Sequence, residues 1–558
     1  MKYKIGKLLN YLKLILLYFN TLKYLKKSQI LFRILNFLEI RHVSKKVSFH
    51  LMDFSNNWVK LVTKNKSIIK SNYFNFLNQE HYVDINTWKT EKQDKLWEYN
   101  LHYFNFINSV DYIIIYKYKS LIKKWISANP PFYGVGWDRY PTSIRIVNWI
   151  KWILLGNELD NIELKSLFIQ SRWLFKNPER HLLGNHFFSN LKALIFAGCI
   201  FNSPEAKKWF FWSLKNINVQ LQEQVLSDGG HFERSPMYHA LFLEDILDLI
   251  NLANTFKTID KTIVTNWENL ACQMLCWLKS MIHTDKEIAF FNDASLGVAN
   301  SFEDLLIYAK KLSLNIKNIS HNNNNNNKIC VTHLNNSGYI RLESKKAVAI
   351  LDVAPLGPDY LPAHGHADTL SFEMSVLGER VVVNGGTSCY ENNNIRLKER
   401  QTSSHSTVEV NNKDSSEVWG SFRVANRAYP KNLSIKELDN QINISCSHTG
   451  YAKQGKGIWH IRNWLMKDNE IEVIDQIKGE YNTATSRVIF HPNVSITKKH
   501  NSIFDIHLLS GKRLKLKLLN GDGKIIKVKH AIEFGKVLDT KCLLIQINDS
   551  NSHYKLTW

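Results

Sequence analysis

The run HNNNNNNK, from His321 to Lys328, separates two parts of the chain that differ in hydrophobic period. A polar tract of this kind cannot bury a core, so it predicts a linker over residues 321–328. Before it, apolar residues recur every three or four positions, which is typical of amphipathic helices. After it, short runs rich in Val, Ile, Thr and aromatic residues alternate with turn signals, which is typical of strands.

The part before the linker is predicted to be a series of helices from about Trp97 to Leu314. Their connections are short and contain Gly, Asn and Pro. So many helices of similar length in series favour a helical array or toroid over a bundle. The clearest predicted helices are Ile144–Leu155, Phe187–Cys199, Tyr238–Ala253 and Trp267–Ile282.

The part after the linker is predicted to be antiparallel sheet, because turn signals such as Asn520-Gly521-Asp522-Gly523 separate its short apolar runs. The predicted strands include Ala347–Val353, Thr369–Ser375, Arg380–Val383, Ser406–Val410, Ile471–Ile477 and Leu543–Ile547. We therefore expect an α+β multidomain fold. An N-terminal α/α toroid, an incomplete helical barrel over residues 91–320, precedes a C-terminal antiparallel β-sandwich over residues 329–558.

The length and composition indicate a globular protein of at least two domains, since 558 residues exceed what one hydrophobic core usually supports. The chain is 44% hydrophobic and 22% charged, which excludes disorder and fibres. Its formal net charge of +22 creates a field that attracts anions. Nucleic acid, anionic lipid and acidic polysaccharide all fit this field, and solvated surface lysines explain it equally well.

The positive charge is concentrated in the first 50 residues, where eleven Lys or Arg stand against one acid, Glu39. These cations interleave with Leu, Ile, Phe and Tyr, as in a basic amphipathic helix. Such a helix either packs on the protein's own body or lies on a membrane surface. We expect residues 1–90 to pack on the helical domain, with peripheral membrane contact through residues 1–50 as the alternative.

The cellular compartment is weakly determined by the sequence. Lys13 interrupts the apolar stretch near the N-terminus and no small-residue cleavage site follows, so the segment does not read as a secretory signal. No uninterrupted apolar run of about 18 residues predicts a spanning helix. Seven scattered cysteines without a CxxC pair argue against a disulfide framework.

Two polar clusters interrupt the apolar helical segments. In HLLGNHFFSN, Gly184 breaks the chain, Asn185 is predicted to cap the next helix, and His186 follows it. In DGGHFERSPMYH, Ser235 is predicted to be a helix cap and Pro236 the first helical residue, which places Tyr238 in the first turn. The positive helix end favours anions there and would help a tyrosine to ionise. A purely structural role is the alternative for both clusters.

The strongest chemical signal in the second part is Ala363-His364-Gly365-His366-Ala367-Asp368. In an extended strand His364, His366 and Asp368 would share one face, an arrangement suited to a zinc site or to proton transfer. The alternative is a loop with two exposed histidines. A long polar loop follows, in the kind of segment where binding residues tend to lie, and it contains Asn384, Tyr390, Arg396, Arg400 and His405.

Several of these stretches occur together in an order that resembles the heparinase II/III-like family of polysaccharide lyases. They are WEYNLHYFNF, WDRYPTSIRIVNWIKW, GNHFFSN, DGGHFERSPMYH, HGHADTLSFEMSVLGERVVVNGGT and SSHSTVEV. The similarity covers roughly Trp97 to Tyr429. It implies a helical toroid followed by an antiparallel β-sandwich, with the active site in the cleft between them, and the bacterial periplasm as location, with the cytoplasm as the alternative.

The resemblance also implies roles for individual residues. Asn185 and His186 would neutralise a uronate carboxylate, and Tyr238 and His364 would be the catalytic pair. His366, position 384 and His405 would bind zinc. Asn384, whose amide brings no charge, stands where the family has Asp. The residues predicted to bind substrate are His239, Arg234, Tyr390, Arg396 and Arg400.

The chemistry of β-elimination requires such groups. Removing the proton next to a uronate carboxylate creates an enolate-like dianion, which is costly unless fixed donors neutralise the carboxylate. A base takes the C5 proton and an acid protonates the departing O4, roles that Tyr238 and His364 fill in either order. Tyr238 would need a positive neighbourhood to act as base, for which His364, His239 and Arg234 are the candidates.

The predicted function is therefore a polysaccharide lyase acting on an acidic, uronate-containing glycan. The alternative is a non-catalytic protein of the same fold that binds acidic polysaccharide or accompanies its biosynthesis. Nucleic-acid binding is not expected, because no known module for it is present, and no HExxH motif supports a zinc hydrolase. The identity of the glycan and the oligomeric state are not determined by the sequence.

Overall fold

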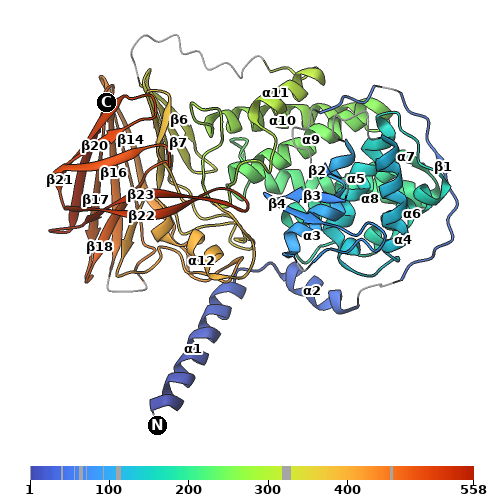
Figure 1. Cartoon of the computed structure of the whole chain (residues 1–558), viewed down its shortest axis with the longest axis horizontal. Coiled ribbons are helices and arrows are strands. Elements are labelled where there is room, and N and C mark those ends of the chain that lie inside the picture. The colour runs from blue at the N-terminus through green and yellow to red at the C-terminus, as the bar shows by residue number, and fades with distance from the viewer. Residues whose placement is uncertain are drawn as a thin grey trace.

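The computed structural model describes residues 2–38, 42–55, 57–61, 67–70, 72–91, 93–108, 115–316, 329–452 and 457–558. Helices dominate the described residues up to 316, and the large sheets follow residue 329 (Figure 1). The predicted order of a helical part followed by a sheet part is confirmed. The predicted linker at 321–328 lies outside the described residues.

Amphipathic helices build the helical region, and those from residue 95 onward surround one apolar core. The helices are α1 Lys2–Leu22, α2 Lys27–Leu35, α3 Lys95–Tyr103, α4 Ile115–Ala128, α5 Arg139–Leu154, α6 Asn161–Lys176, α7 Gly184–Ile200, α8 Pro204–Gln224, α9 Pro236–Phe256, α10 Lys261–Ser280 and α11 Phe302–Lys311. The short helix α12, Asn394–Arg400, lies among the strands. All four predicted helices occur, within a few residues of their expected ends.

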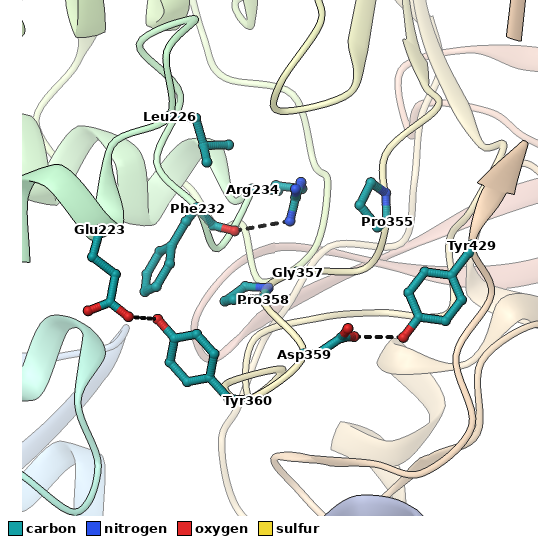
Figure 2. Close-up of a pocket in the computed structure, with 10 residues that line it drawn as sticks. All are labelled: Glu223, Leu226, Phe232, Arg234, Pro355, Gly357, Pro358, Asp359, Tyr360 and Tyr429. Carbon is teal, nitrogen blue, oxygen red and sulfur yellow. Dashed lines mark hydrogen bonds between the residues drawn. The ribbon is translucent and has the colours of Figure 1, made fainter. Parts of the chain in front are cut away.

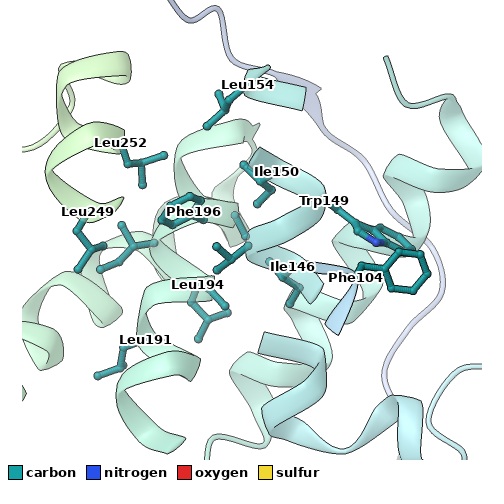
Figure 3. Close-up of a cluster of buried hydrophobic side chains, with 14 of the residues drawn as sticks. Phe104, Ile146, Trp149, Ile150, Leu154, Leu191, Leu194, Phe196, Leu249 and Leu252 are labelled. Atoms are coloured by element: carbon teal, nitrogen blue, oxygen red, sulfur yellow. The ribbon is translucent and has the colours of Figure 1, made fainter. Parts of the chain in front are cut away.

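The core of this region lies where α5, α7 and α9 meet (Figure 3). Trp149 and Ile150 on α5, Leu194 on α7 and Leu249 on α9 have no exposed surface. Helix α7 is apolar on nearly all sides because α5, α8 and α9 cover it. This packing fixes the N-terminal ends of α7 and α9, the two predicted polar clusters.

The sheet region contains three large antiparallel sheets. Their strand orders are β10-β9-β8-β7-β6, β11-β18-β23-β22 and β14-β15-β16-β17-β24-β21-β20-β19. The strands are β6 Cys330–Leu334, β7 Tyr339–Glu343, β8 Ala347–Asp352, β9 Phe372–Val376, β10 Glu379–Val382, β11 Val408–Val410, β14 Pro430–Leu438, β15 Gln441–His448, β16 Trp459–Lys467, β17 Glu470–Lys478, β18 Ala484–Ile489, β19 Ser495–His500, β20 Ile503–His507, β21 Arg513–Asn520, β22 Asp522–Glu533, β23 Lys536–Gln546 and β24 Asn551–Thr557. Small sheets join β12 Val418–Trp419 to β13 Arg423–Val424, β1 His50–Leu51 to β5 Phe201–Asn202, and β2 Ile68–Lys70 to β3 Tyr73–Phe76 and β4 Gln79–Tyr82.

The five-stranded sheet is the middle layer of the molecule. Along β8, Ala349 and Leu351 point into the core shared with the eight-stranded sheet, whereas Val348 and Ile350 pack against Trp277 of α10. This alternation explains why every residue of β8 is buried. The sheet thereby joins the helical region rigidly to the sheet region, and the functional residues lie along this junction.

The N-terminal segment differs in part from its prediction. Residues 43–55 and 57–61 and strand β3 pack on the helical core through side chains that include Phe49, Trp58 and Phe74. Helix α1 does not: its described side chains are mostly exposed, and Tyr18 and Thr21 contact Trp419 of the sheet region instead. Figure 1 shows α1 projecting away from the body. Among the described residues, no helix combines the length and the apolarity needed to cross a membrane.

Candidate active site

Tyr238 lies in the first turn of α9, at the junction of the helical and sheet regions. Ser235 caps this helix, because its Oγ accepts a hydrogen bond from the backbone N–H of Tyr238 at 3.2 Å. The same hydroxyl donates to the backbone carbonyl of Asp293 at 2.5 Å. The predicted cap at Ser235 and helix start at Pro236 are therefore confirmed. The phenol oxygen of Tyr238 lies 3.0 Å from that of Tyr390.

His364 faces Tyr238 from the sheet region. The centroids of the two rings are 4.0 Å apart, and the His364 side chain is 12% exposed. The predicted strand through this motif is wrong, because residues 361–369 form turns and bends. The backbone N–H of Gly365 donates to the carbonyl of Pro362, and the backbone N–H of Ser371 donates to the carbonyl of Asp368. Both are local turn hydrogen bonds and not hydrogen bonds between paired strands. His364 and Tyr238 nevertheless meet, as predicted.

Asp293 is the residue around which this motif is organised. Its carboxylate accepts hydrogen bonds from Nδ1 of His364 and Nε2 of His366, each at 2.8 Å, and from the guanidinium of Arg396. Burial opposes its ionisation, yet Arg396 and the two histidines hold the pKa of Asp293 well below its usual range. An ionised carboxylate only accepts hydrogen bonds. Nδ1 of His364 therefore carries the proton, and Nε2 presents a lone pair.

Glu233 is a second buried carboxyl group at the site. Neither of its side-chain oxygens has a hydrogen-bond partner among the described residues, and Oε2 lies 3.7 Å from Nε2 of His364. Burial raises the pKa of Glu233, against the influence of His364 and His186. A buried group without partners is costly, so such groups are expected where a ligand completes the hydrogen bonds.

Asn185 and His186 lie in the first turn of α7, close to Glu233. The helix starts at Gly184, so the prediction that Asn185 caps it is wrong: the N-cap is Leu183. A Cβ at Gly184 would lie 2.5 Å from Leu361 and 3.1 Å from Oε1 of Glu233, which shows how tightly this turn packs on both motifs. Asn185 itself is half-buried.

His186 is held by groups on its own side of the cleft. Its Nδ1 lies 3.0 Å from Oε1 of Glu179, and its ring packs on Tyr140 with centroids 4.5 Å apart. Burial disfavours the charged form, but Glu179 raises the pKa of His186 above its usual value. His186 is therefore suited to carry positive charge beside the unpaired carboxyl of Glu233.

Tyr238 is held in its protonated form. Burial, then Tyr390, Asp293 and Glu233, raise the pKa of Tyr238 well above 10.0. The expected helix-end effect does not dominate, because the helix N-terminus already bonds to Ser235 and carboxylates surround the phenol. Of the groups expected to supply positive charge, His239 and Arg234 do not do so.

His239 and Arg234, both predicted to bind substrate, are held by contacts within the protein. His239 is fully buried, its Nε2 lies 2.9 Å from the carbonyl of Met274, and burial lowers its pKa to about 3. Its ring stacks on Trp277. The guanidinium of Arg234 donates to backbone carbonyls of residues 232, 336 and 337. His239 is satisfied within the protein, whereas Arg234 donates to three backbone carbonyls and also lines the cavity described below.

Arg396 and Arg400 were also predicted to bind substrate, and both are fully buried. Arg396 pairs with Asp293, and Arg400 donates to the carbonyls of Gly365, Gly420 and Arg423. These contacts hold the segment that carries His364, and the predicted contact of both arginines with substrate stays a prediction. Tyr390 alone of the predicted binding residues keeps a position at the site, beside Tyr238 and 5.8 Å from the His364 ring centroid.

The predicted zinc ligands lie together but form an incomplete donor set. Nδ1 of His366 lies 3.1 Å from Nε2 of His405, and their other nitrogens bond to Asp293 and to the carbonyl of Gln401. The amide of Asn384 bonds to Ser371 and to the backbone of Ser406. No group of three His, Cys, Asp or Glu suited to a metal occurs in the described residues. Two imidazoles and a neutral amide fit zinc poorly, so no catalytic step is assigned to it.

Sequence reasoning missed Asp293 and Glu233. Asp293 lies in FFNDASLG, a loop without periodicity or a known motif. The only signal was a pair of polar residues between buried apolar ones. Leu183, Arg234 and Asn292, each just before a site segment, have φ of 64°, 58° and 55°. Left-handed backbone costs a non-glycine residue roughly 1–2 kcal/mol, so packing of the site stabilises these conformations.

A cavity of about 410 Å³ lies next to this cluster (Figure 2). It is lined from the helical region by Glu223 and Phe232, and from the sheet region by Asp359, Tyr360 and Tyr429. Tyr238 and His364 are not among its lining residues, although Phe232 belongs to the same motif as Tyr238. The cavity and the pair formed by Tyr238 and His364 are therefore two separate features of the junction.

Comparison with known protein families identifies matches over most of the chain. The model described as heparinase II/III N-terminus matches residues 21–314, and the one described as heparinase II/III-like, C-terminal, matches residues 327–539. A heparin-sulfate lyase of Pedobacter heparinus is 24% identical over 335 residues, which cover 54% of this chain and 49% of the relative. A heparin-sulfate lyase of Bacteroides stercoris is 23% identical over a stretch that covers 62% of this chain and 51% of the relative. The chain thus matches about half the length of these curated relatives.

Solved structures show the same fold. The crystal structure of heparinase III has a TM-score of 0.66 at 16% identity, covering 83% of this chain and 76% of that one. A heparan sulfate lyase mutant from Pedobacter heparinus has a TM-score of 0.60 at 17% identity, covering 85% and 79%. These matches confirm the predicted combination of a helical N-terminal region with antiparallel sheets.

Proposed function

Because this chain belongs to the heparinase II/III family, we propose that it is a polysaccharide lyase that cleaves an acidic, uronate-containing glycan by β-elimination. The observation that carries the proposal is the approach of His364 to Tyr238, with Nδ1 of His364 bonded to Asp293. This arrangement supplies one proton acceptor and one proton donor within reach of the same sugar ring.

His364 is the base. Asp293 fixes its tautomer, so Nε2 receives the proton from C5 of the uronate as the C5–H electrons form the C4–C5 double bond. Asp293 also stabilises the imidazolium that results, as an ionised, fully buried carboxylate. His239 cannot replace His364, since it is buried against Trp277 and satisfied by backbone groups.

Tyr238 is the acid. Its raised pKa keeps the phenol protonated, and its O–H donates to O4 as the C4–O4 bond breaks. The phenolate that remains is close to the protonated His364, so a proton passes back between them or through solvent to restore the resting state. Tyr390 supports the phenol through the hydroxyl contact at 3.0 Å.

Asn185, His186 and Glu233 bind the uronate carboxylate. Asn185 donates from its amide and His186 carries positive charge, because Glu179 raises its pKa. Glu233, whose pKa is raised by burial, adds an uncharged carboxylic acid that donates a further hydrogen bond. Neutralising the carboxylate lowers the energy of the dianionic intermediate, which limits the uncatalysed reaction.

The substrate class follows from charge and from the relatives. The chain carries a net charge of +22, which favours polyanions, and the two relatives are named heparin-sulfate lyases. We therefore place glycosaminoglycans first and other uronans second. Incubation with heparin, heparan sulfate, chondroitin sulfate and alginate tests this, because elimination creates a conjugated, unsaturated uronate that absorbs ultraviolet light. Binding without any such absorbance would favour the non-catalytic alternative.

A further inference from the structure

The two N-terminal helices expose apolar faces that no other part of the described chain covers. On α1 the exposed large apolar side chains are Tyr11, Leu12, Leu14, Ile15, Leu16, Tyr18, Phe19 and Leu22. Their spacing gives α1 a broad apolar side, with Ile15 and Phe19 near its centre. Phe19 is 64% exposed. Contiguous apolar surface of this kind marks an interaction site.

Helix α2 also has an exposed apolar side. Its exposed residues Ile30, Leu31, Ile34 and Leu35 have the same spacing, and Phe37 just beyond it is 90% exposed. Isolated apolar residues are common on protein surfaces, but two consecutive helices with one exposed apolar face each are not. Together these residues are called the N-terminal apolar face.

Both helices also contact the body of the protein. On α1, Tyr18 packs edge-on against Trp419 at 4.9 Å, and Thr21 accepts a hydrogen bond from the indole of Trp419. On α2, the Gln29 amide donates a hydrogen bond to the carbonyl of Tyr360, and the guanidinium of Arg180 lies over the ring of Phe32. On α2 these contacts lie opposite the exposed apolar residues, whereas on α1 they involve one edge of the apolar side and leave Ile15 and Phe19 exposed.

The charge around this face has one sign. Residues 1–38 contain eight cations and no Asp or Glu. The cations are Lys2, Lys4, Lys7, Lys13, Lys23, Lys26, Lys27 and Arg33. Lys13, Lys23, Lys27 and Arg33 are exposed, whereas Lys26 pairs with Glu223. An apolar face with exposed Lys and Arg at its borders matches the chemistry of an anionic bilayer, whose acyl region takes the apolar side chains and whose headgroups pair with the cations.

We propose that the N-terminal apolar face docks this protein on an anionic lipid surface, with α1 and α2 lying in the interface. Self-association is disfavoured, because two copies of the face would bring like charges together without any acidic partner. Docking also places the active site near the lipid surface. Trp419 and Arg423, which hold α1, belong to the β12–β13 hairpin, and Phe422 in its turn contacts the rings of His364 and Tyr390.

The test uses the full chain and vesicles of phosphatidylcholine with or without phosphatidylglycerol, separated by sedimentation. Ile15→Glu with Phe19→Glu removes part of the face. The matched control is Ile162→Glu with Phe211→Glu, which changes two apolar residues elsewhere on the helical region. Ile162 and Phe211 are each 66% exposed, so the two double variants remove similar exposed apolar surface. Circular dichroism and thermal melting of all three proteins establish that they fold alike.

We expect the wild type and the control to sediment with phosphatidylglycerol vesicles and to bind phosphatidylcholine weakly. The partition coefficient of the α1 variant should fall at least about tenfold. Each large apolar side chain that enters the acyl region raises the partition coefficient by about that factor. Failure of the wild type to bind anionic vesicles, or equal binding by the α1 variant, would overturn the proposal. So would vesicle-independent dimerisation that the α1 variant abolishes in sedimentation velocity.

Discussion

Nδ1 of His364 lies 2.8 Å from a carboxylate oxygen of Asp293, and Nε2 of His366 lies 2.8 Å from the other oxygen. One carboxylate from a loop of the helical region thus orients both histidines of the HGH motif. Asp293 is tied in turn to α9 through Ser235, so His364 and Tyr238 are positioned by a shared set of contacts. The site depends on the junction between the two regions.

Replacing Asp293 with Asn should reduce kcat at least about 100-fold, because the amide no longer fixes the tautomer of His364 or stabilises its charged form. KM should change little, since Asp293 is fully buried and does not touch the glycan. Stability should fall by about 3–5 kcal/mol, as Arg396 loses its buried partner. Steady-state kinetics and urea unfolding measure both effects.

Thr387→Val is the control for this variant. Its hydroxyl also donates to Asp293, at 3.2 Å, but does not contact His364. We expect it to lower stability by about 1 kcal/mol and to leave kcat nearly unchanged. An Asp293→Asn enzyme with wild-type kcat would show that His364 does not need this orientation.

Glu233→Gln should change the pH dependence of stability. Burial raises the pKa of Glu233 above 4.5, so the folded state binds this proton more tightly than the unfolded chain does. That contribution to stability is complete below about pH 4.5 and is lost as the pH rises through the raised pKa. The Gln variant stays uncharged and should therefore melt at a higher Tm than wild type at about pH 8, with the difference vanishing in acid.

Thermal melts of both proteins over this range test the sign of the effect. The Gln variant should also keep lyase activity, because an amide still donates to the substrate carboxylate, whereas Glu233→Ala should raise KM. A Gln variant that is less stable than wild type at alkaline pH would mean that Glu233 is ionised and paired in the folded protein.

The helix starts and the chain's division into two parts followed from local signals. Ser235 and Pro236 predict the start of α9 because capping depends on residues close in sequence. The turn at Gly521 was predicted for the same reason, and it separates β21 from β22 with φ of 99°. Tyr238 was singled out by the helix start at Pro236 and His364 by the His-Gly-His motif, and the family resemblance implied their catalytic roles.

The roles of the buried charges could not be predicted in this way. Arg396 and Arg400 look like exposed anion-binding residues in a polar loop, but their partners are Asp293 and backbone carbonyls distant in sequence. Nothing local to a guanidinium reveals such partners. Asp293 was missed for the reciprocal reason, since its importance comes from three segments that meet only in the fold.

Arg400→Lys should therefore act on stability and not on substrate binding. A lysine cannot replace the forked contacts to Gly365, Gly420 and Arg423, and each buried carbonyl left unpaired costs about 1–3 kcal/mol. We expect a loss of about 3 kcal/mol in urea unfolding, with KM unchanged for the folded enzyme. A large rise in KM at unchanged stability would restore Arg400 as a substrate-binding residue.

Asn384→Asp should create a stronger zinc site. The aspartate adds a charged oxygen ligand beside His366 and His405, whose facing nitrogens are 3.1 Å apart. We expect zinc to raise the Tm of this variant more than that of wild type, and chelation to reverse the effect. Wild-type protein that binds zinc as tightly as the variant in calorimetry would show that the amide suffices.

The most direct test of the account compares Tyr238→Phe with Tyr390→Phe on whichever uronan the wild type degrades. Both variants lose one hydroxyl of the same 3.0 Å contact, but only Tyr238 is assigned a proton transfer. The initial rate of ultraviolet absorbance should fall by about 10²–10⁴ in Tyr238→Phe and by a much smaller factor in Tyr390→Phe, with both variants folded. Unsaturated product formed by Tyr238→Phe at the wild-type rate would contradict the account.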